Sequence, residues 1–493
     1  MRNTRLCVIG NGMVGHRFIE ELIDKSPADR YEITVFCEEP RQAYDRVHLS
    51  SYFSHHTAED LSLVREGFYA KHHIQVFIAE RALTIDRQRK EVSSGAGRTV
   101  CYDKLVIATG SYPRVPPIEG SNGPDCFVYR TIEDLNAIEA CALRSKRGVV
   151  IGGGLLGLEA AGALKNLGIE THVVEFANVL MAEQLDTTGG EQLRKKIERL
   201  GVQVHTGKNT RQIIQQGSES RKTLLFADGS SLETDFVVFS TGIRPQDSLA
   251  RQCGLVTAER GGIAINRQCQ TSDADIYAIG ECASYQNHVY GLVAPGYKMA
   301  RVVAAHLCDQ SAEFDGADMS AKLKLLGVDV GGLGDAHGRT PGCRSYIYLN
   351  ETKEVYKRLI VSADNRLLLG AVLVGDTTDY ANLLQLMLNG IELPENPEQL
   401  ILPACAAGES RVMGVDKLPD SAQICSCFDV SKGTIIKAIA DGCHTVAALK
   451  TATHAGTGCG GCIPLLTQVL NSELSRQIGR HTSELQSRGL NSY

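Results

Sequence analysis

The chain has 493 residues, 43% hydrophobic and 22% charged, a composition typical of a globular protein with about three or four domains. The formal net charge of −6 gives no basic field to favour nucleic acid or an anionic membrane as a partner. No apolar run reaches the roughly 18 residues of a membrane span, and the N-terminus lacks the pattern of a signal peptide. We therefore expect a cytoplasmic protein with reduced cysteines, most of them buried, such as Cys7, Cys101 and Cys308.

The first predicted unit is strand, glycine loop, helix and strand. A short apolar strand over residues 5–9 leads into Gly10, Gly12 and Gly15, and apolar residues at helical spacing follow. The next strand ends at Glu38, 28 residues after Gly10. Such a loop lets backbone N–H groups approach a pyrophosphate, and the acid can accept a hydrogen bond from a ribose hydroxyl.

The same pattern occurs a second time. A strand over residues 149–151 leads into Gly152, Gly154 and Gly157, and the following strand ends at Glu175. A single copy could be a tight turn without a ligand. Two copies, each between a strand and a helix and each followed by an acid, indicate two dinucleotide sites.

Further strands surround the second loop. Strands over 105–108 and 236–239 run into Thr109-Gly110 and Ser240-Thr241-Gly242, and Asp228-Gly229 predicts a hairpin turn. Alternating strands and helices of this kind predict parallel sheets covered by helices.

The pattern changes near residue 318. Residues 323–330, 344–349, 355–361 and 367–374 alternate as antiparallel strands do, and a helix is expected over 380–389. We interpret residues 318–403 as an α+β domain and 404–419 as a linker. The polar stretch 480–493 has no apolar face, and we interpret it as a non-native tail.

Four cysteines near the C-terminus have the spacing of a metal centre. Cys425 and Cys427 form a C-x-C pair, Cys459 and Cys462 form a C-x-x-C pair, and 31 residues separate the pairs. Four thiolates with glycines around them favour a [2Fe–2S] cluster, and a structural zinc site is the alternative. Cys443, within an apolar stretch, is expected to be core.

Other candidates are weaker. Cys282 has no nearby cysteine, so we expect no thiol redox role for it. The pairs His55-His56 and His72-His73 are sequence neighbours, which rarely share one metal ion, and we assign them no site.

The two loops, together with the segment from Thr271 to Glu281, resemble the flavoproteins with two dinucleotide domains. That resemblance implies FAD on the first loop and a nicotinamide nucleotide on the second. It places Glu281, where the family usually has Asp, beside the ribityl chain of the flavin. FAD is expected on Gly10, Gly12, Gly15 and Glu38 together with residues from about 236 to 310, which include Gly280 and Glu281, and NADH on Gly152, Gly154, Gly157 and Glu175. Further expected cofactor contacts are Arg46, Thr109, Gly110 and Gly242.

The expected architecture is α/β, with two Rossmann-like dinucleotide-binding domains, an α+β domain and a small helical [2Fe–2S] domain. The cysteine block resembles the bacterioferritin-associated ferredoxin module. The boundaries are 1–115 and 236–310 for the two parts of the FAD domain, 116–235 for the NAD domain, 318–403 for the α+β domain and 420–475 for the ferredoxin-like domain.

From about Arg5 to Gln477 the chain resembles the large subunits of the NADH-dependent nitrite reductase family, including the segments 14–20, 43–51 and 327–332 and the Cys425–Cys462 block. The resemblance implies hydride transfer from NADH to FAD, with Glu159 near the nicotinamide, and then single electrons to the cluster. The family continues into a module with sirohaem and a [4Fe–4S] cluster, but no cysteine follows Cys462 here, so we expect a truncated chain. The resemblance also implies two possible partners, a small nitrite reductase subunit and a second copy of the chain in a homodimer.

Three alternatives stay open at this point. The chain could be an NADH:ferredoxin or rubredoxin reductase, the electron-transfer subunit of an assimilatory nitrate reductase, or a non-enzymatic redox sensor.

Overall fold

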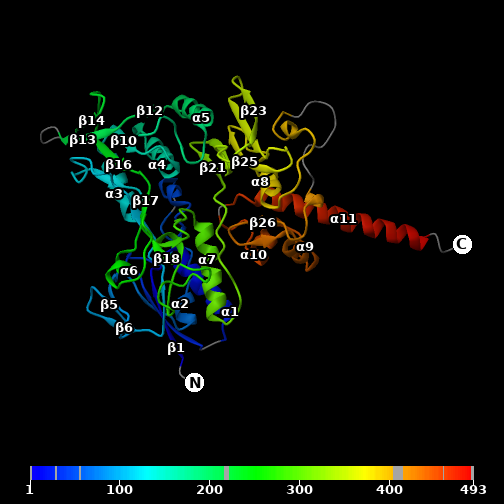
Figure 1. Cartoon of the computed structure of the whole chain (residues 1–493), viewed down its shortest axis with the longest axis horizontal. Coiled ribbons are helices and arrows are strands. Elements are labelled where there is room, and N and C mark those ends of the chain that lie inside the picture. The colour runs from blue at the N-terminus through cyan, green and yellow to red at the C-terminus, as the bar shows by residue number, and fades with distance from the viewer. Residues whose placement is uncertain are drawn as a thin grey trace. The chain divides into compact units, whose positions relative to one another are not determined.

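The computed structural model describes residues 3–27, 30–54, 57–215, 221–403, 415–458 and 460–489 (Figure 1). The chain divides into two compact units. Unit 1 comprises Met1–Met181 and Ile197–Asp318, and unit 2 comprises Ala182–Lys196 and Met319–Tyr493. Among the described helices, none combines the length and the apolar composition that crossing a membrane requires.

The first sheet of unit 1 is parallel and carries the first glycine loop. Its strands, in spatial order, are β19 (Ile276–Ala278), β7 (Lys104–Ile107), β1 (Thr4–Ile9), β2 (Tyr31–Phe36) and β3 (Gln75–Phe77). Helices α1 (Met13–Lys25) and α7 (Val293–Leu307) pack against each other. Phe18, Ile19 and Leu22 of α1 are fully buried, as the helical spacing predicts. The packing is close, because a β-carbon at Gly296 of α7 would lie 2.5 Å from a methyl group of Val14.

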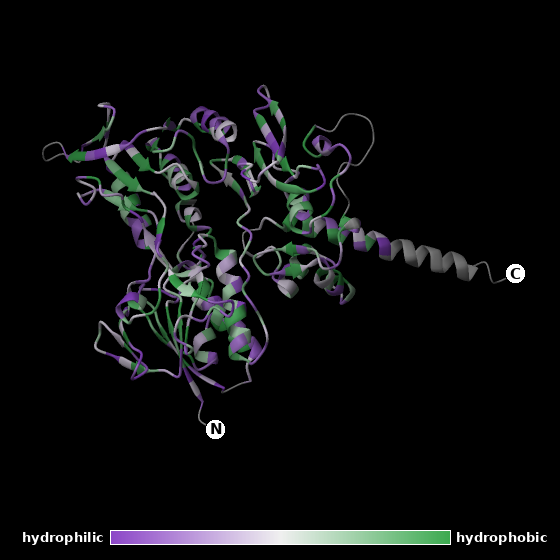
Figure 2. Ribbon diagram, viewed as in Figure 1, coloured by the Kyte–Doolittle hydropathy of each residue, from purple (hydrophilic) through white to green (hydrophobic). Residues whose placement is uncertain are grey.

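The second sheet of unit 1 is also parallel, and it carries the second loop. Its strands, in spatial order, are β12 (Gln203–His205), β11 (Glu170–Val174), β10 (Arg147–Ile151), β16 (Phe236–Phe239) and β9 (Cys126–Val128). Helix α4 (Leu155–Asn166) follows β10, and α3 (Ile132–Ala142) follows β9. Figure 2 shows strands of this sheet in green, in keeping with burial on both faces.

The domain boundary expected at residue 236 is wrong in one respect. Strand β16 lies in the second sheet, since it pairs in parallel with β10 and β9, and not in the sheet of the first loop. The chain leaves the first sheet through β8 (Ser111–Pro113) and returns from the second through β17 (Ile243–Pro245). These two connecting strands pair with each other antiparallel.

Smaller sheets and short helices complete unit 1. The expected turn at Asp228-Gly229 is confirmed, because it joins β14 to β15 in an antiparallel hairpin. Cys101, expected to be buried, is instead exposed on β6, which is an edge strand. The remaining elements are β4 (Ala82–Asp86), β5 (Glu91–Ser94), β6 (Thr99–Cys101), β13 (Thr210–Gln215), β14 (Lys222–Phe226), β15 (Ser231–Thr234), β18 (Ile263–Ile265), β20 (Ala283–Tyr285), α2 (Phe68–Lys71), α6 (Ser248–Gln252), η1 (Leu49–Ser54) and η2 (Gly280–Cys282).

Unit 2 begins with an antiparallel sheet. Its strands, in spatial order, are β21 (Ala321–Leu325), β22 (Val328–Gly334), β25 (Leu368–Val374), β24 (Val355–Val361) and β23 (Arg344–Asn350). Residues 323–330, expected to be one strand, form a hairpin instead, because Leu326 and Gly327 both have positive φ. Helix α8 (Tyr380–Leu388) covers the sheet and buries Leu383 and Leu386. Helix α5 (Thr187–Arg199) starts within unit 2, and the preceding Asp186 accepts hydrogen bonds from Tyr356 and Arg358.

The cysteine module is small and mostly helical. A hairpin of β26 (Gln423–Cys425) and β27 (Val430–Ser431) precedes α9 (Lys432–Ala440), α10 (Val446–Thr453) and α11 (Ile463–Gly489). Ile435, Leu449 and Leu466 form part of its buried interior. Helix α11 continues into the stretch expected to be a tail, and residues 490–493 lie outside the described residues. Residues 404–414 of the expected linker also lie outside the described residues. The helix η3 (Pro397–Leu400) precedes this segment, and η4 (Val415–Lys417) follows it.

Candidate functional site

The first glycine loop is built for close approach. Gly10 follows β1 with φ of +109°, and a β-carbon there would lie 2.2 Å from the carbonyl oxygen of Ala108. A β-carbon at Gly15 would lie 2.2 Å from the carbonyl oxygen of Gly10. At Gly12 such an atom would meet nothing within 4 Å, and Gly12 caps α1 without a side-chain hydrogen bond. The end of α1 therefore presents an open space beside N–H groups, which fits a pyrophosphate.

The second loop repeats this geometry. Gly152 has φ of +119°, and its β-carbon would lie 2.1 Å from the carbonyl oxygen of Ser240. At Gly157 the β-carbon would lie 1.9 Å from the carbonyl oxygen of Gly152, whereas at Gly154 it would meet nothing within 4 Å. The chain therefore has two loops of the same kind at the carboxyl ends of two parallel sheets, where ligands of such folds bind.

Each loop has its acid nearby. Glu175 follows β11 and accepts hydrogen bonds from the backbone N–H groups of Gly153 (2.5 Å) and Ala177 (2.7 Å). Glu38 follows β2, is exposed, and accepts from the side-chain amide of Gln246 at 3.2 Å while pairing with Arg81 at 3.3 Å. Glu175 is therefore held by the second glycine loop itself, whereas Glu38 is held by side chains; the ribose contacts of both acids stay predictions.

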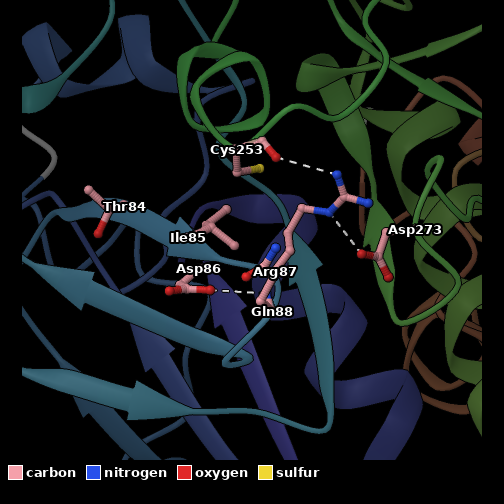
Figure 3. Close-up of a pocket in the computed structure, with 7 residues that line it drawn as sticks. All are labelled: Thr84, Ile85, Asp86, Arg87, Gln88, Cys253 and Asp273. Carbon is pink, nitrogen blue, oxygen red and sulfur yellow. Dashed lines mark hydrogen bonds and ion pairs between the residues drawn. The ribbon is translucent and has the colours of Figure 1, made fainter.

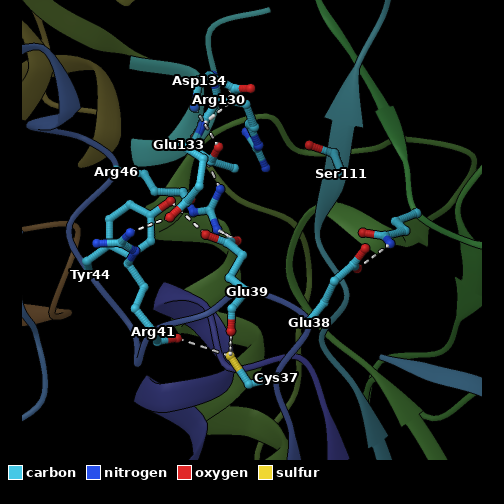
Figure 4. A network of polar contacts seen from close by, with 12 residues as sticks. Cys37, Glu38, Glu39, Arg41, Tyr44, Arg46, Ser111, Arg130, Glu133 and Asp134 are labelled. Carbon is cyan, nitrogen blue, oxygen red and sulfur yellow. Dashed lines mark hydrogen bonds and ion pairs between the residues drawn. The ribbon is translucent and has the colours of Figure 1, made fainter. Parts of the chain in front are cut away.

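Glu281 lies in a network of charges above the first sheet. Glu281 lies in η2, and its carboxylate accepts hydrogen bonds from Ser111 Oγ and from the Arg130 guanidinium, both at 2.7 Å. Arg46 donates to the carbonyl oxygen of Arg130 at 3.2 Å and forms an ion pair with Glu39. Figure 4 shows Arg46 and Arg130 together with Glu39 and Ser111. The guanidinium of Arg130 is therefore held by Glu281, and that of Arg46 by Glu39 and the backbone of Arg130.

Arg130, Ser111 and Glu39 belong to no motif of the sequence that predicts a cofactor contact. In the part of the chain that the structure describes, the Nε atom of Arg130 is buried without a hydrogen-bond partner, which marks it as a candidate ligand contact. A single arginine after a short strand forms no recognisable motif. The capping box of Thr131 and Asp134 that follows it marks the start of a helix, and could have shown that Arg130 lies just before that helix.

The remaining strand-end residues lie at the same edge. The hydroxyl of Thr109 donates to the carbonyl oxygen of Gln246 at 2.7 Å, next to Gly110. The N–H of Gly280 donates to the sulfur of Met299 at 3.3 Å, and Gly242 precedes the connecting strand β17. Their roles as ligand contacts stay predictions.

Glu159 lies in the second turn of α4, just after the second loop. Burial raises the pKa of its carboxyl group to about 7, with the charge of His48 acting in the opposite direction. His48 belongs to the segment beside η1, where Asp45 accepts a 2.8 Å hydrogen bond from its Nδ1 atom. A carboxyl group with this pKa gains or loses a proton near neutral pH.

Three of the four predicted cluster cysteines converge. Hydrogen bonds from the thiols of Cys427 and Cys462 hold the pKa of the Cys425 thiol well below its usual range. A β-carbon at Gly458 would lie 3.1 Å from the β-carbon of Cys427 and 3.3 Å from its sulfur, so the backbone of Gly458 lies close to that thiol. Cys459 lies outside the described residues, and without it the described side chains contain no complete group that could hold a metal ion. Converging thiols surrounded by glycines fit an iron–sulfur cluster.

Other predicted candidates remain apart from these sites. Cys282 is buried, its thiol donates to the backbone carbonyls of Ile279 and Ile107, and burial raises its pKa. Cys443 is partly exposed. His55 and His56 lie outside the described residues.

A polar pocket of about 660 Å³ opens elsewhere in unit 1 (Figure 3). Its guanidinium group, from Arg87, already donates to Asp273 at 2.9 Å and to the carbonyl oxygen of Cys253 at 3.4 Å. We assign no cofactor to it.

Comparison with known protein families agrees with this layout. Residues 4–306 match the pyridine nucleotide-disulphide oxidoreductases, 320–391 match the C-terminal domain of rubredoxin NAD+ reductase, and 423–472 match the BFD-like [2Fe-2S] binding domain. The resemblance of the cysteine block to the ferredoxin module is confirmed.

Individual relatives give the same result. The chain is 74% identical, over 97% of its length, to the nitrite reductase (NADH) large subunit of Escherichia coli, and 56% identical, over 96%, to the nitrite reductase [NAD(P)H] large subunit of Klebsiella oxytoca. The alignments cover 56% and 49% of those proteins, so the chain spans about half the length of the curated relatives it matches. The solved ferredoxin reductase for the CYP199A2 system of Rhodopseudomonas palustris superposes with a TM-score of 0.72 at 25% identity, covering 81% of this chain and 97% of that one. The predicted resemblance and α/β fold are confirmed.

Proposed function

Because the chain belongs to the family of pyridine nucleotide-disulphide oxidoreductases, we propose that it is the electron-input part of a nitrite reductase, an enzyme module that oxidises NADH. Bound FAD would supply a hydride acceptor, and a bound [2Fe–2S] cluster would supply single-electron transfer. The observation that carries the proposal is the presence in one chain of two glycine loops with the same geometry and a group of converging cysteines.

FAD is held by the first sheet. Gly10 and Gly15 allow the tight turn and the close packing of the loop after β1, the open space at Gly12 beside the first N–H groups of α1 takes the pyrophosphate, and Glu38 accepts from the adenosine ribose. Arg46 adds positive charge, and Glu281 accepts from the ribityl chain. The remaining contacts, at the strand ends, are Thr109, Gly110 and Gly280. Bound FAD accepts a hydride and returns electrons one at a time.

NADH is held by the second sheet. Gly152, Gly154 and Gly157 cradle its pyrophosphate, and Glu175 accepts from its adenosine ribose. Gly242, after β16, lines the same edge, and Glu159 lies beside the nicotinamide. The residues of this sheet orient the nicotinamide over the flavin, and positioning of this kind supplies most of the rate enhancement in hydride transfer.

The cluster is held by Cys425, Cys427, Cys459 and Cys462. Glycines at 456, 458, 460 and 461 allow the backbone to close around the sulfurs and to donate N–H groups to them. We propose that these electrons continue to a sirohaem and [4Fe–4S] module or to a small nitrite reductase subunit, and that the enzyme works in the cytoplasm as a homodimer.

A visible spectrum recorded during NADH titration tests the proposal. With FAD bound, NADH should bleach the visible absorption of the flavin (on the order of one equivalent) and then the cluster bands. Ferricyanide should reoxidise both, and the chain alone should form no ammonia from nitrite. Rubredoxin as an acceptor tests the alternative that the chain is a rubredoxin reductase. Turnover with rubredoxin as fast as with ferricyanide would favour that alternative. Failure of NADH to reduce bound FAD would contradict the proposal.

A further inference from the structure

Tyr129 is a buried tyrosine whose hydroxyl group is left unsatisfied by the described part of the chain. It follows β9 at the carboxyl edge of the second sheet, and only 4% of its surface is exposed. Its hydroxyl group has no hydrogen-bond partner among the residues that the structure describes. Buried hydroxyl groups in native proteins are almost always paired, because leaving one unpaired lowers stability.

The position of Tyr129 shows which kind of ligand group could pair with it. Strand β9 lies next to β16, and β16 lies next to β10, which leads into the second glycine loop. The carboxyl ends of these strands form the ligand edge of such a sheet. Tyr129 is therefore on the same edge as Gly152 and Ser240, and away from Glu175, which follows β11 on the other side of β10.

Glu159 is the ionisable neighbour of this hydroxyl. Its carboxylate acts electrostatically on the Tyr129 phenol, and its side chain is partly buried near the start of α4. Helix α4 packs beside η1. Tyr129 therefore offers a hydroxyl donor, and Glu159 offers a carboxyl acceptor.

A primary carboxamide matches this pair, since its oxygen accepts and its nitrogen donates. On the basis of the function proposed above, we infer that Tyr129 is a positioning residue that binds the carboxamide of the nicotinamide ring. Its hydroxyl donates to the amide oxygen, and Glu159 accepts from the amide nitrogen. Fixing the carboxamide fixes the rotation of the ring about its glycosidic bond, and therefore which face it offers to the flavin.

The test uses the FAD-loaded chain and the variant Tyr129→Phe. We measure the dissociation constants of NADH and of ADP-ribose, which lacks the nicotinamide. The variant should bind NADH about five- to tenfold more weakly, as expected for one lost hydrogen bond, and ADP-ribose equally well. Its Tm without nucleotide should not fall, because the substitution removes an unpaired buried hydroxyl.

Two further variants make the test specific. Tyr102→Phe replaces another buried tyrosine of unit 1 and should leave both constants unchanged. Glu159→Leu should lose the preference for NADH over its reduced acetylpyridine analogue, which keeps the oxygen but lacks the amide nitrogen.

Unchanged NADH binding in Tyr129→Phe, or equal weakening for NADH and ADP-ribose, would overturn the inference. Failure of the wild-type chain to bind ADP-ribose would instead overturn the proposed function, and the inference with it. The two failures are therefore distinguishable.

Discussion

The carboxylate of Glu175 accepts a 2.5 Å hydrogen bond from the backbone N–H of Gly153, so this acid and the second glycine loop form one rigid element. Its second hydrogen bond, from the N–H of Ala177, fixes the following turn. A nucleotide bound on the loop therefore meets a negative charge in a fixed position.

That charge predicts a preference for NADH over NADPH. A 2′-phosphate beside Glu175 would meet like charge, at a cost on the order of several kcal/mol, and Phe176-Ala177-Asn178 supplies no cation to offset it. We expect kcat/KM for NADPH to be lower by at least about two orders of magnitude. Glu175→Gln should narrow the gap, whereas Glu170→Gln, at the other end of the same strand, should preserve it. Equal efficiencies for the two nucleotides in the wild type would refute this prediction.

Gly154 and Gly157 should respond differently to the same added methyl group. Gly154→Ala finds open space and should fold normally, but the methyl group occupies the place of the pyrophosphate, so KM for NADH should rise about tenfold or more. Gly157→Ala places an atom 1.9 Å from the carbonyl oxygen of Gly152 and should lower Tm and soluble yield. Thermal melting and NADH kinetics on both variants separate the effects. A Gly154→Ala chain as unstable as Gly157→Ala would show that the open space is filled.

Glu159 should make stability depend on pH near neutrality. Its folded-state pKa of about 7 lies above the ordinary value of 4.5, so between these values the unfolded chain loses a proton that the folded chain keeps. The contribution of this group to stability therefore falls as pH rises from about 4.5 to about 7, and stays at its lower value above that. Glu159→Gln should match the wild-type Tm at low pH and exceed it above pH 7. A difference in Tm that is the same at every pH would contradict this assignment.

The cluster should be separable from the flavin. Cys427→Ser should abolish the iron–sulfur absorption and paramagnetic signal, because three thiolates do not complete the site, while FAD remains bound on the first sheet. Cys443→Ser, a matched change in the same module, should retain the signal. Analysis of iron, sulfide and zinc after anaerobic purification identifies the metal that is bound. Stoichiometric zinc without iron would establish the zinc alternative.

The sequence predicted the loops well because their function restricts each residue locally. Gly10, Gly15, Gly152 and Gly157 have no room for a side chain, so the motif is visible in the sequence itself. The assignment of β16 failed because a short apolar strand carries no mark of the sheet it joins; that depends on pairing with β10, about 90 residues earlier. Arg130 was missed for the same reason, since its partner Glu281 lies 151 residues further along the chain.

The insertion of the second sheet between strands of the first has a consequence for synthesis. Strand β7 ends at Ile107, but its neighbour β19 begins only at Ile276, after all strands of the second sheet have been made. On the ribosome the second sheet can therefore fold while the first still lacks an edge strand. We expect a nascent chain arrested after β16 has left the ribosome, but before β19 has done so, to protect the second sheet from protease and yet fail to retain FAD. A mutation that slows folding of the second sheet would delay closure of the first, although it touches no residue there.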